Sequence, residues 1–163
     1  MKIGILFFLA FINFTVNASE IDIVNKVLLY KKIQFIQNSV NEMTGITSES
    51  SGFIERDGEI ISINIQKPFD EKYIINETQI KIIDNDFDQE STIEISTLPN
   101  KDLIKLIKSG FEEKDVLKIS KTSYQLKDSQ KPILIRDIAD NSFSLIYLDN
   151  LDVLNTIIFM VKV

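Results

Sequence analysis

The chain has 163 residues, with 18 Lys and Arg against 24 Asp and Glu, a formal net charge of −6, and neither His nor Cys. The absence of His and Cys excludes the commonest general base, a cysteine nucleophile and most transition-metal sites. The acidic balance argues against nucleic acid or an anionic membrane surface as a partner.

The N-terminus has the pattern of an export signal. Lys2 precedes an apolar run over residues 3–16, and Val16-Asn17-Ala18 offers small residues where a signal peptidase cleaves. The alternative is a membrane anchor, but the run is shorter than the roughly 20 residues that span a bilayer, and Asn13 interrupts it. We therefore predict a cleavable signal peptide over residues 1–18.

Cleavage there would leave residues 19–163 as one domain of ordinary size, long enough to bury a core without disulfides. The mature chain also lacks the acylated cysteine of a bacterial lipoprotein, because it has no cysteine at all. We expect a protein that is soluble in the periplasm.

The first predicted elements are a helix and a strand. Ser19-Glu20-Ile21-Asp22 resembles a capping box, and an apolar stripe follows it, which predicts a helix over residues 19–28. Residues 30–40 have a mixed pattern that could continue this helix or begin a strand, and we favour a strand from about Phe35. The polar residues 44–52 are expected to form a loop.

The clearest strand lies at Ile61, Ile63 and Ile65, which alternate with polar residues until Pro68 ends the pattern. Further short strands are expected at the spacing of an antiparallel meander, with Asp-Ser and Asp-Asn turn signals between the later ones. They fall at residues 73–75, 80–83, 92–96, 116–119, 123–127, 132–136, 143–148 and 154–163.

A second helix is expected between these strands. Asn100 can cap it after Pro99, and Gly110 ends it. Its apolar side carries Leu103, Ile104, Leu106 and Ile107, whereas three lysines face the other way.

These elements predict a mainly β (α+β) fold: a strongly curved antiparallel sheet, or incomplete β-barrel, whose concave face is covered by short helices. A bent sheet of eight or more strands encloses more volume than its own side chains need to fill, so an apolar cavity suited to acyl chains can remain. The alternative is that the isoleucines form an ordinary packed core. Periodicity alone does not decide between the two.

The acidic cluster Asp84, Asp86 and Asp88 has the spacing that begins a calcium loop. Phe87 replaces the glycine-containing turn of such loops, and no bidentate Glu follows at the right distance, so a solvated turn is favoured. We expect no catalytic residue, metal or cofactor. A secreted enzyme that uses two carboxylates remains open, although no pair of acidic residues lies in an apolar setting that would raise one pKa.

Two segments carry a family resemblance. Residues 67–73 read Lys-Pro-Phe-Asp-Glu-Lys-Tyr, and residues 76–89 end in Asp-Asn-Asp-Phe-Asp-Gln. This order resembles the outer-membrane lipoprotein carrier protein family (LolA), and the N-terminal signal, both helices, Gly52 and residues 148–150 and 155–159 fall in family order. The sequence departs from the family pattern at Lys67, Glu71, Lys81 and Ile83.

The resemblance implies a periplasmic chaperone that shields the acyl chains of lipoproteins in an apolar cavity. It would accept them from an inner-membrane ABC transporter and pass them to an outer-membrane acceptor, as a monomer and without catalysis. A periplasmic domain of the same fold that senses lipids or lipoproteins is the alternative. A protein of either kind would bind its ligand through the hydrophobic effect, about 0.8 kcal/mol for each CH₂ withdrawn from water.

The resemblance also suggests site residues. Lys67 stands where the family has a basic residue that latches the helical lid. The lid itself would be lined by Leu103, Ile104 and Ile107. The expected cavity residues on the concave face of the sheet are Phe35, Phe53, Ile61, Ile63, Ile65, Tyr73, Ile93 and Ile95.

Overall fold

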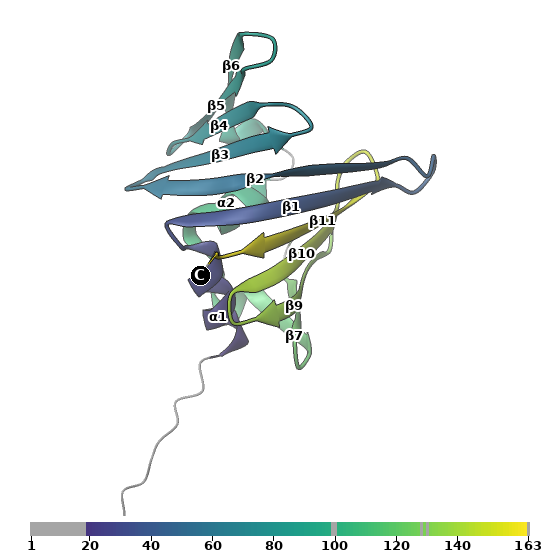
Figure 1. Ribbon diagram of the computed structural model, residues 1–163. Helices are drawn as coiled ribbons and strands as arrows, with labels where there is room; N and C mark the ends of the chain where they lie inside the picture. The colour runs from purple at the N-terminus through teal and green to yellow at the C-terminus, as the bar shows by residue number, and fades with distance from the viewer. Residues whose placement is uncertain (1–18, 99–100, 128, 130, 163) are drawn as a thin grey trace, which may run out of the picture.

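The computed structural model describes residues 19–98, 101–127, 129 and 131–162 (Figure 1). The predicted signal peptide over residues 1–18 and the predicted helix cap at Asn100 lie outside these residues. Neither helix in the described part of the chain is long and apolar enough to cross a bilayer.

Eleven strands make up most of the fold. They are β1 (Lys32–Asn41), β2 (Thr47–Asp57), β3 (Ile60–Lys67), β4 (Glu71–Ile75), β5 (Gln79–Asp84), β6 (Gln89–Glu94), β7 (Val116–Ser120), β8 (Ser123–Leu126), β9 (Ile133–Ala139), β10 (Ser142–Leu148) and β11 (Val153–Met160). Two α-helices, α1 (Glu20–Leu28) and α2 (Lys101–Ser109), and two short 3₁₀ helices, Ile95–Thr97 and Glu113–Asp115, complete the described elements.

All eleven strands belong to one antiparallel sheet in the order β6-β5-β4-β3-β2-β1-β11-β10-β9-β8-β7. The sheet is not closed, since β6 and β7 are its two edges. It is curved, and both helices lie on the same side of it (Figure 1). The predicted fold class, a curved and mainly β sheet with short helices, is therefore confirmed.

Helix α1 begins where its local sequence predicts. The Ser19 hydroxyl accepts a hydrogen bond from the Asp22 backbone N–H at 3.3 Å, and the Asp22 carboxylate accepts one from the Ser19 N–H at 3.0 Å. Four apolar side chains of α1 are buried against β9, β10 and β11: Ile21, Val24, Val27 and Leu28. Behind them the rings of Phe143 and Phe159 stack with their centroids 5.0 Å apart, in the middle of the core.

Three predicted boundaries differ from the structure. Residues 47–52 are strand rather than loop, because β2 begins at Thr47 and pairs with β1 from Thr47 to Glu55. The side chains of Thr47, Ser48 and Glu49 are exposed on β2, so no apolar alternation marks this part of the strand. The first strand begins at Lys32 rather than near Phe35, and β6 ends at Glu94, where a 3₁₀ turn replaces the predicted continuation.

Gly52 allows β2 and β3 to approach closely. The register shifts between Ser51 and Gly52, and a Cβ on Gly52 would lie 1.9 Å from the carbonyl oxygen of Asn64. No larger residue fits there without moving the backbone of β3. The same glycine leaves a gap in the row of side chains on the helix-covered face, between Phe35 and Ile65.

Candidate functional site

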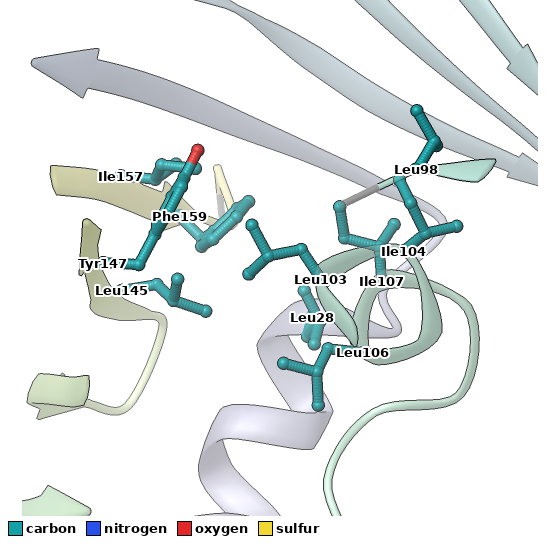
Figure 2. Close-up of a pocket in the computed structure, with 10 residues that line it drawn as sticks. All are labelled: Leu28, Leu98, Leu103, Ile104, Leu106, Ile107, Leu145, Tyr147, Ile157 and Phe159. Atoms are coloured by element: carbon teal, nitrogen blue, oxygen red, sulfur yellow. The ribbon is translucent and has the colours of Figure 1, made fainter. Parts of the chain in front are cut away.

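Two neighbouring cavities lie between α2 and the concave face of the sheet. One has a volume of about 300 Å³ and the other about 380 Å³. Five residues line both, so the two cavities adjoin: Leu98, Ile104, Ile107, Ile157 and Phe159. We refer to them as the smaller cavity, drawn in Figure 2, and the larger cavity.

The strand register makes the wall of the larger cavity apolar. Successive side chains of a strand point to opposite faces, so one row across the sheet collects every second residue of each strand. One such row runs from Ile54 through Ile63 and Tyr73 to Ile82, on four consecutive strands. The larger cavity is also lined by Phe35, Gln37, Ile65, Ile80 and Ile93.

The smaller cavity lies where α2 faces α1 and the centre of the sheet. Leu28 lines it from α1, while Leu145 and Tyr147 line it from β10. Figure 2 shows Leu103 extending from α2 toward Phe159 on the opposite wall. None of the described residues that line either cavity is charged.

Most of the predicted cavity residues meet in this place. Phe35, Ile63, Ile65, Tyr73 and Ile93 line the larger cavity. From α2, Leu103 lines the smaller cavity, and Ile104 and Ile107 line both.

Two other predicted cavity residues pack elsewhere. Ile61 belongs to the buried core, and Ile95 sits in the 3₁₀ turn after β6 and packs against the core. Neither lines one of these two cavities.

Phe53 is on the other face of the sheet, so its placement in the cavity was wrong. Its ring lies 4.0 Å from the Lys32 ammonium nitrogen, in a cation–π contact. The neighbouring Ile54 is 2 % exposed and lines the larger cavity instead. Because β2 starts with polar residues, the sequence did not reveal which of these two apolar neighbours faces inward.

The predicted latch at Lys67 is also wrong. Lys67 is exposed at the end of β3, and its side chain makes no hydrogen bond to any residue that the structure describes. Arg56 makes the expected contacts: its Nη2 donates to the carbonyl of Leu28, at 2.8 Å, and to that of Ile107. A planar guanidinium supplies both donors in a fixed geometry, which the ammonium of a lysine does not.

The position of Arg56 suits its charge. Leu28 and Ile107 lie in the last turns of α1 and α2, where carbonyl groups lack partners within the helix and the helix dipole is negative. Burial lowers the pKa of the Arg56 guanidinium from its ordinary value, although an arginine keeps its charge in proteins. One cation thus joins the ends of both helices to β2.

A second connection joins the helices to each other. The Asn25 side chain of α1 donates to the Phe111 carbonyl at 2.8 Å and accepts from the Phe111 N–H at 2.7 Å. Gly110, with φ of 75°, makes the turn that brings Phe111 to this position. A Cβ on Gly110 would lie 2.5 Å from the Asn25 Oδ1, so the turn also needs a residue without a side chain.

The two cavity tyrosines are neutral. Burial, and next the hydrogen bond to Glu71, raise the pKa of Tyr73 above its ordinary value, and the Tyr73 hydroxyl donates to the Glu71 carboxylate at 2.6 Å. Burial, with a smaller effect of Asp149, raises the pKa of Tyr147 to about 12. Both phenols therefore keep their protons throughout the physiological range.

The acidic turn between β5 and β6 is held by its own backbone. Asp84 Oδ1 accepts from the backbone N–H of Asp86 at 3.1 Å and of Phe87 at 3.0 Å, as the solvated-turn interpretation predicts. Within the described ranges, no group of three or more Asp, Glu, His or Cys side chains is arranged to hold a metal ion.

Comparison with known proteins adds no family to this geometry. No model of a known protein family matches the chain, and no curated protein matches it significantly.

Proposed function

We propose that this protein is a periplasmic chaperone that carries acylated lipoproteins with their acyl chains in the two adjoining cavities. The observation that carries the proposal is the pair of cavities, about 300 and 380 Å³, walled by uncharged and almost entirely apolar side chains. An acyl chain is worth about 0.8 kcal/mol for each CH₂ removed from water, so ten buried CH₂ groups contribute about 8 kcal/mol.

The cover of the cavities is suited to admit and release such a ligand. Helix α2 is amphipathic: Leu103, Ile104 and Ile107 face the cavities, and Lys101 and Lys105 are exposed to solvent. It is no part of the sheet and is held at its C-terminal end by Arg56 and the Gly110 turn, and in this proposal a ligand displaces the helix while the sheet stays folded. The same function is what the resemblance of residues 67–73 and 76–89 to the lipoprotein carriers implies.

In this proposal the donor is an inner-membrane ABC transporter and the acceptor lies at the outer membrane. The chaperone catalyses no reaction. Cargo passes in one direction only when its affinity for the carrier lies between its affinities for donor and acceptor, which favours an adaptable apolar cavity over a tight polar site. A lipid-sensing domain would bind the same ligand but would not pass it on.

The proposal is tested by purifying the mature chain from the periplasm of a Gram-negative host. Crosslinking and mass spectrometry should find triacylated lipoprotein bound to the native chain. Ile104→Glu places a charge in both cavities and should abolish this loading. The matched control is Lys105→Glu on the exposed side of α2, which should load normally.

Circular dichroism should show the same sheet in both variants, because neither position belongs to a strand. A transfer assay to outer-membrane vesicles then separates a carrier from a sensor. Absence of lipoprotein on the native chain, or equal loading of the two variants, would refute the proposal.

A further inference from the structure

The larger cavity has a polar corner formed by Gln37 of β1 and the groups behind it. Gln37 faces Ile157 of β11, and the next row along the two strands pairs Ser39 with Asn155. Asn155 is 3 % exposed and is one of two buried polar residues in the described core. A buried amide of this kind needs its hydrogen bonds satisfied, so its surroundings fix its orientation.

The orientation of the Asn155 amide follows from its acceptors. Its Nδ2 donates to the Val153 carbonyl at 2.9 Å and lies 3.5 Å from a carboxylate oxygen of Asp149. Asp149 is itself held in place, since its other oxygen accepts from the N–H of Leu151 and of Val153. Reversing the amide would set Oδ1 against two acceptors, so Oδ1 faces Gln37 and Ser39.

This arrangement uses both donors of Gln37. Its Nε2 donates to Asn155 Oδ1 at 2.9 Å and to Ser39 Oγ at 3.1 Å. The Ser39 hydroxyl donates its hydrogen to Asn155 Oδ1 at 2.7 Å, so toward Gln37 it can only be an acceptor. The Gln37 Oε1 has no hydrogen-bond partner among the described residues, and it is not among their buried unpartnered atoms. An accessible carbonyl oxygen therefore remains on this residue of the cavity wall.

The other polar residue of this wall is also an acceptor. Tyr73 lines the larger cavity, and its hydroxyl hydrogen is donated to Glu71. Gln37 and Tyr73 are the only polar side chains among the described residues that line the larger cavity. The wall thus offers oxygen acceptors and no donor or positive charge, which suits an N–H group and disfavours an ionised carboxylate.

We propose that Gln37 determines specificity by accepting a hydrogen bond from an amide N–H of the ligand, so that the larger cavity takes N-acylated chains in preference to free fatty acids. This inference rests on the proposed function, because it assumes that the cavity binds acyl chains. The inference also places the ligand in the cavity. The amide group of the ligand lies beside Gln37, at the polar corner, and its acyl chain extends toward Ile54 and Ile82.

The test compares two ligands that differ by one hydrogen-bond donor. N-methyldodecanamide has an amide N–H, and N,N-dimethyldodecanamide has none; the affinity of each is measured by calorimetry on the intact chain, with dodecanoate at pH 8 as a third ligand. A net hydrogen bond is worth about 0.5–1.5 kcal/mol, so the native protein should prefer the secondary amide by about 3- to 10-fold. Dodecanoate should bind more weakly than the secondary amide.

Two variants assign the preference to Gln37. Gln37→Leu and Gln37→Met both remove the acceptor, and the Ser39 hydroxyl still satisfies Asn155 in each, so at least one should fold. In the folded variant the two amides should bind equally. Gln34→Leu is the control, because it makes the same change on the opposite face of β1 at a residue that lines neither cavity, and it should keep the native ratio.

The outcomes separate this inference from the function on which it rests. Equal affinities of the native protein for the two amides, or a preference that persists in the folded Gln37 variant, would overturn the assignment and leave an acyl-binding cavity. If neither amide nor dodecanoate binds, the cavity does not take acyl chains, and both proposals are wrong.

Discussion

Replacing Arg56 with Met should release the helices from the sheet while keeping the aliphatic part of the side chain. Arg56 donates two hydrogen bonds to backbone carbonyls at the ends of α1 and α2. Hydrogen bonds that involve a charged group contribute about 1.5–3 kcal/mol each. Arg56 is only half-buried and gains solvation when the contacts break, so we expect a loss of about 2–4 kcal/mol rather than the full sum.

The loss should appear where the contacts are. Amide hydrogen exchange in α2 should accelerate by about 30- to 1,000-fold, because each 1.4 kcal/mol corresponds to a factor of ten. Amides of the central strands β1 and β11 should change less, and urea unfolding gives the total change in stability. Arg136→Met is the matched control: it alters the only other arginine of the sequence, which is exposed on β9, and should stay within about 0.5 kcal/mol of the native protein. Exchange in α2 that matches the control would refute the role of Arg56.

Three further substitutions test contacts that hold the sheet and the helices together. Gly52→Ala places a Cβ 1.9 Å from the Asn64 carbonyl and should cost more than about 2 kcal/mol in urea unfolding; a stability equal to that of the native protein would show that β3 can move away. Gly110→Ala meets both a positive φ and a close contact with α1, and should cost about 1–3 kcal/mol and speed amide exchange in α2, whereas unchanged exchange would argue against the turn as an anchor. Hydrogen bonding by the Tyr124 hydroxyl, and secondarily by other partners, lowers the pKa of Glu20 from 4.5 to about 2, so the stability that Glu20 contributes is present above pH 4.5 and is lost as the pH falls toward 2. Glu20→Gln should flatten this part of the pH dependence of the urea midpoint, and parallel curves for the two proteins would contradict it.

Local patterns predicted local structure well. The capping box at Ser19 and the alternation of Ile61, Ile63 and Ile65 identified α1 and β3, since each depends only on neighbouring residues. The start of β2 was missed because its side chains near Thr47 face solvent on both sides of the strand. The sequence also did not show which side of β2 faces the helices. Phe53 is the larger of two adjacent apolar residues, but the register with β1 places Ile54 on the inner face and Phe53 on the outer face.

The contacts that close the site could not be predicted from such patterns. The latch at Arg56 depends on two helix ends meeting one strand, and these three elements are far apart in the sequence. Gln37 did leave a signal, because it is the polar residue in the alternation that begins with Ile33 and Phe35. The sequence does not show that Gln37 belongs to a hydrogen-bonded group. Its partner Asn155 is far along the chain and lies beside it only because β11 pairs with β1.

The pairing of β1 with β11 has a consequence for how the chain folds. These two strands are the first and last that the structure describes, yet they lie next to each other near the middle of the sheet, where Phe35 pairs with Phe159. Strands β1–β6 and β7–β11 can each form by local hairpins, but within the sheet the two halves join only through the pairing of β1 with β11. Folding should therefore be slow for a domain of this size, and the core can close only after β11 has been synthesised. A chain shortened before Val153 would keep β1–β6 and β7–β10 but lose β11, the strand that joins them.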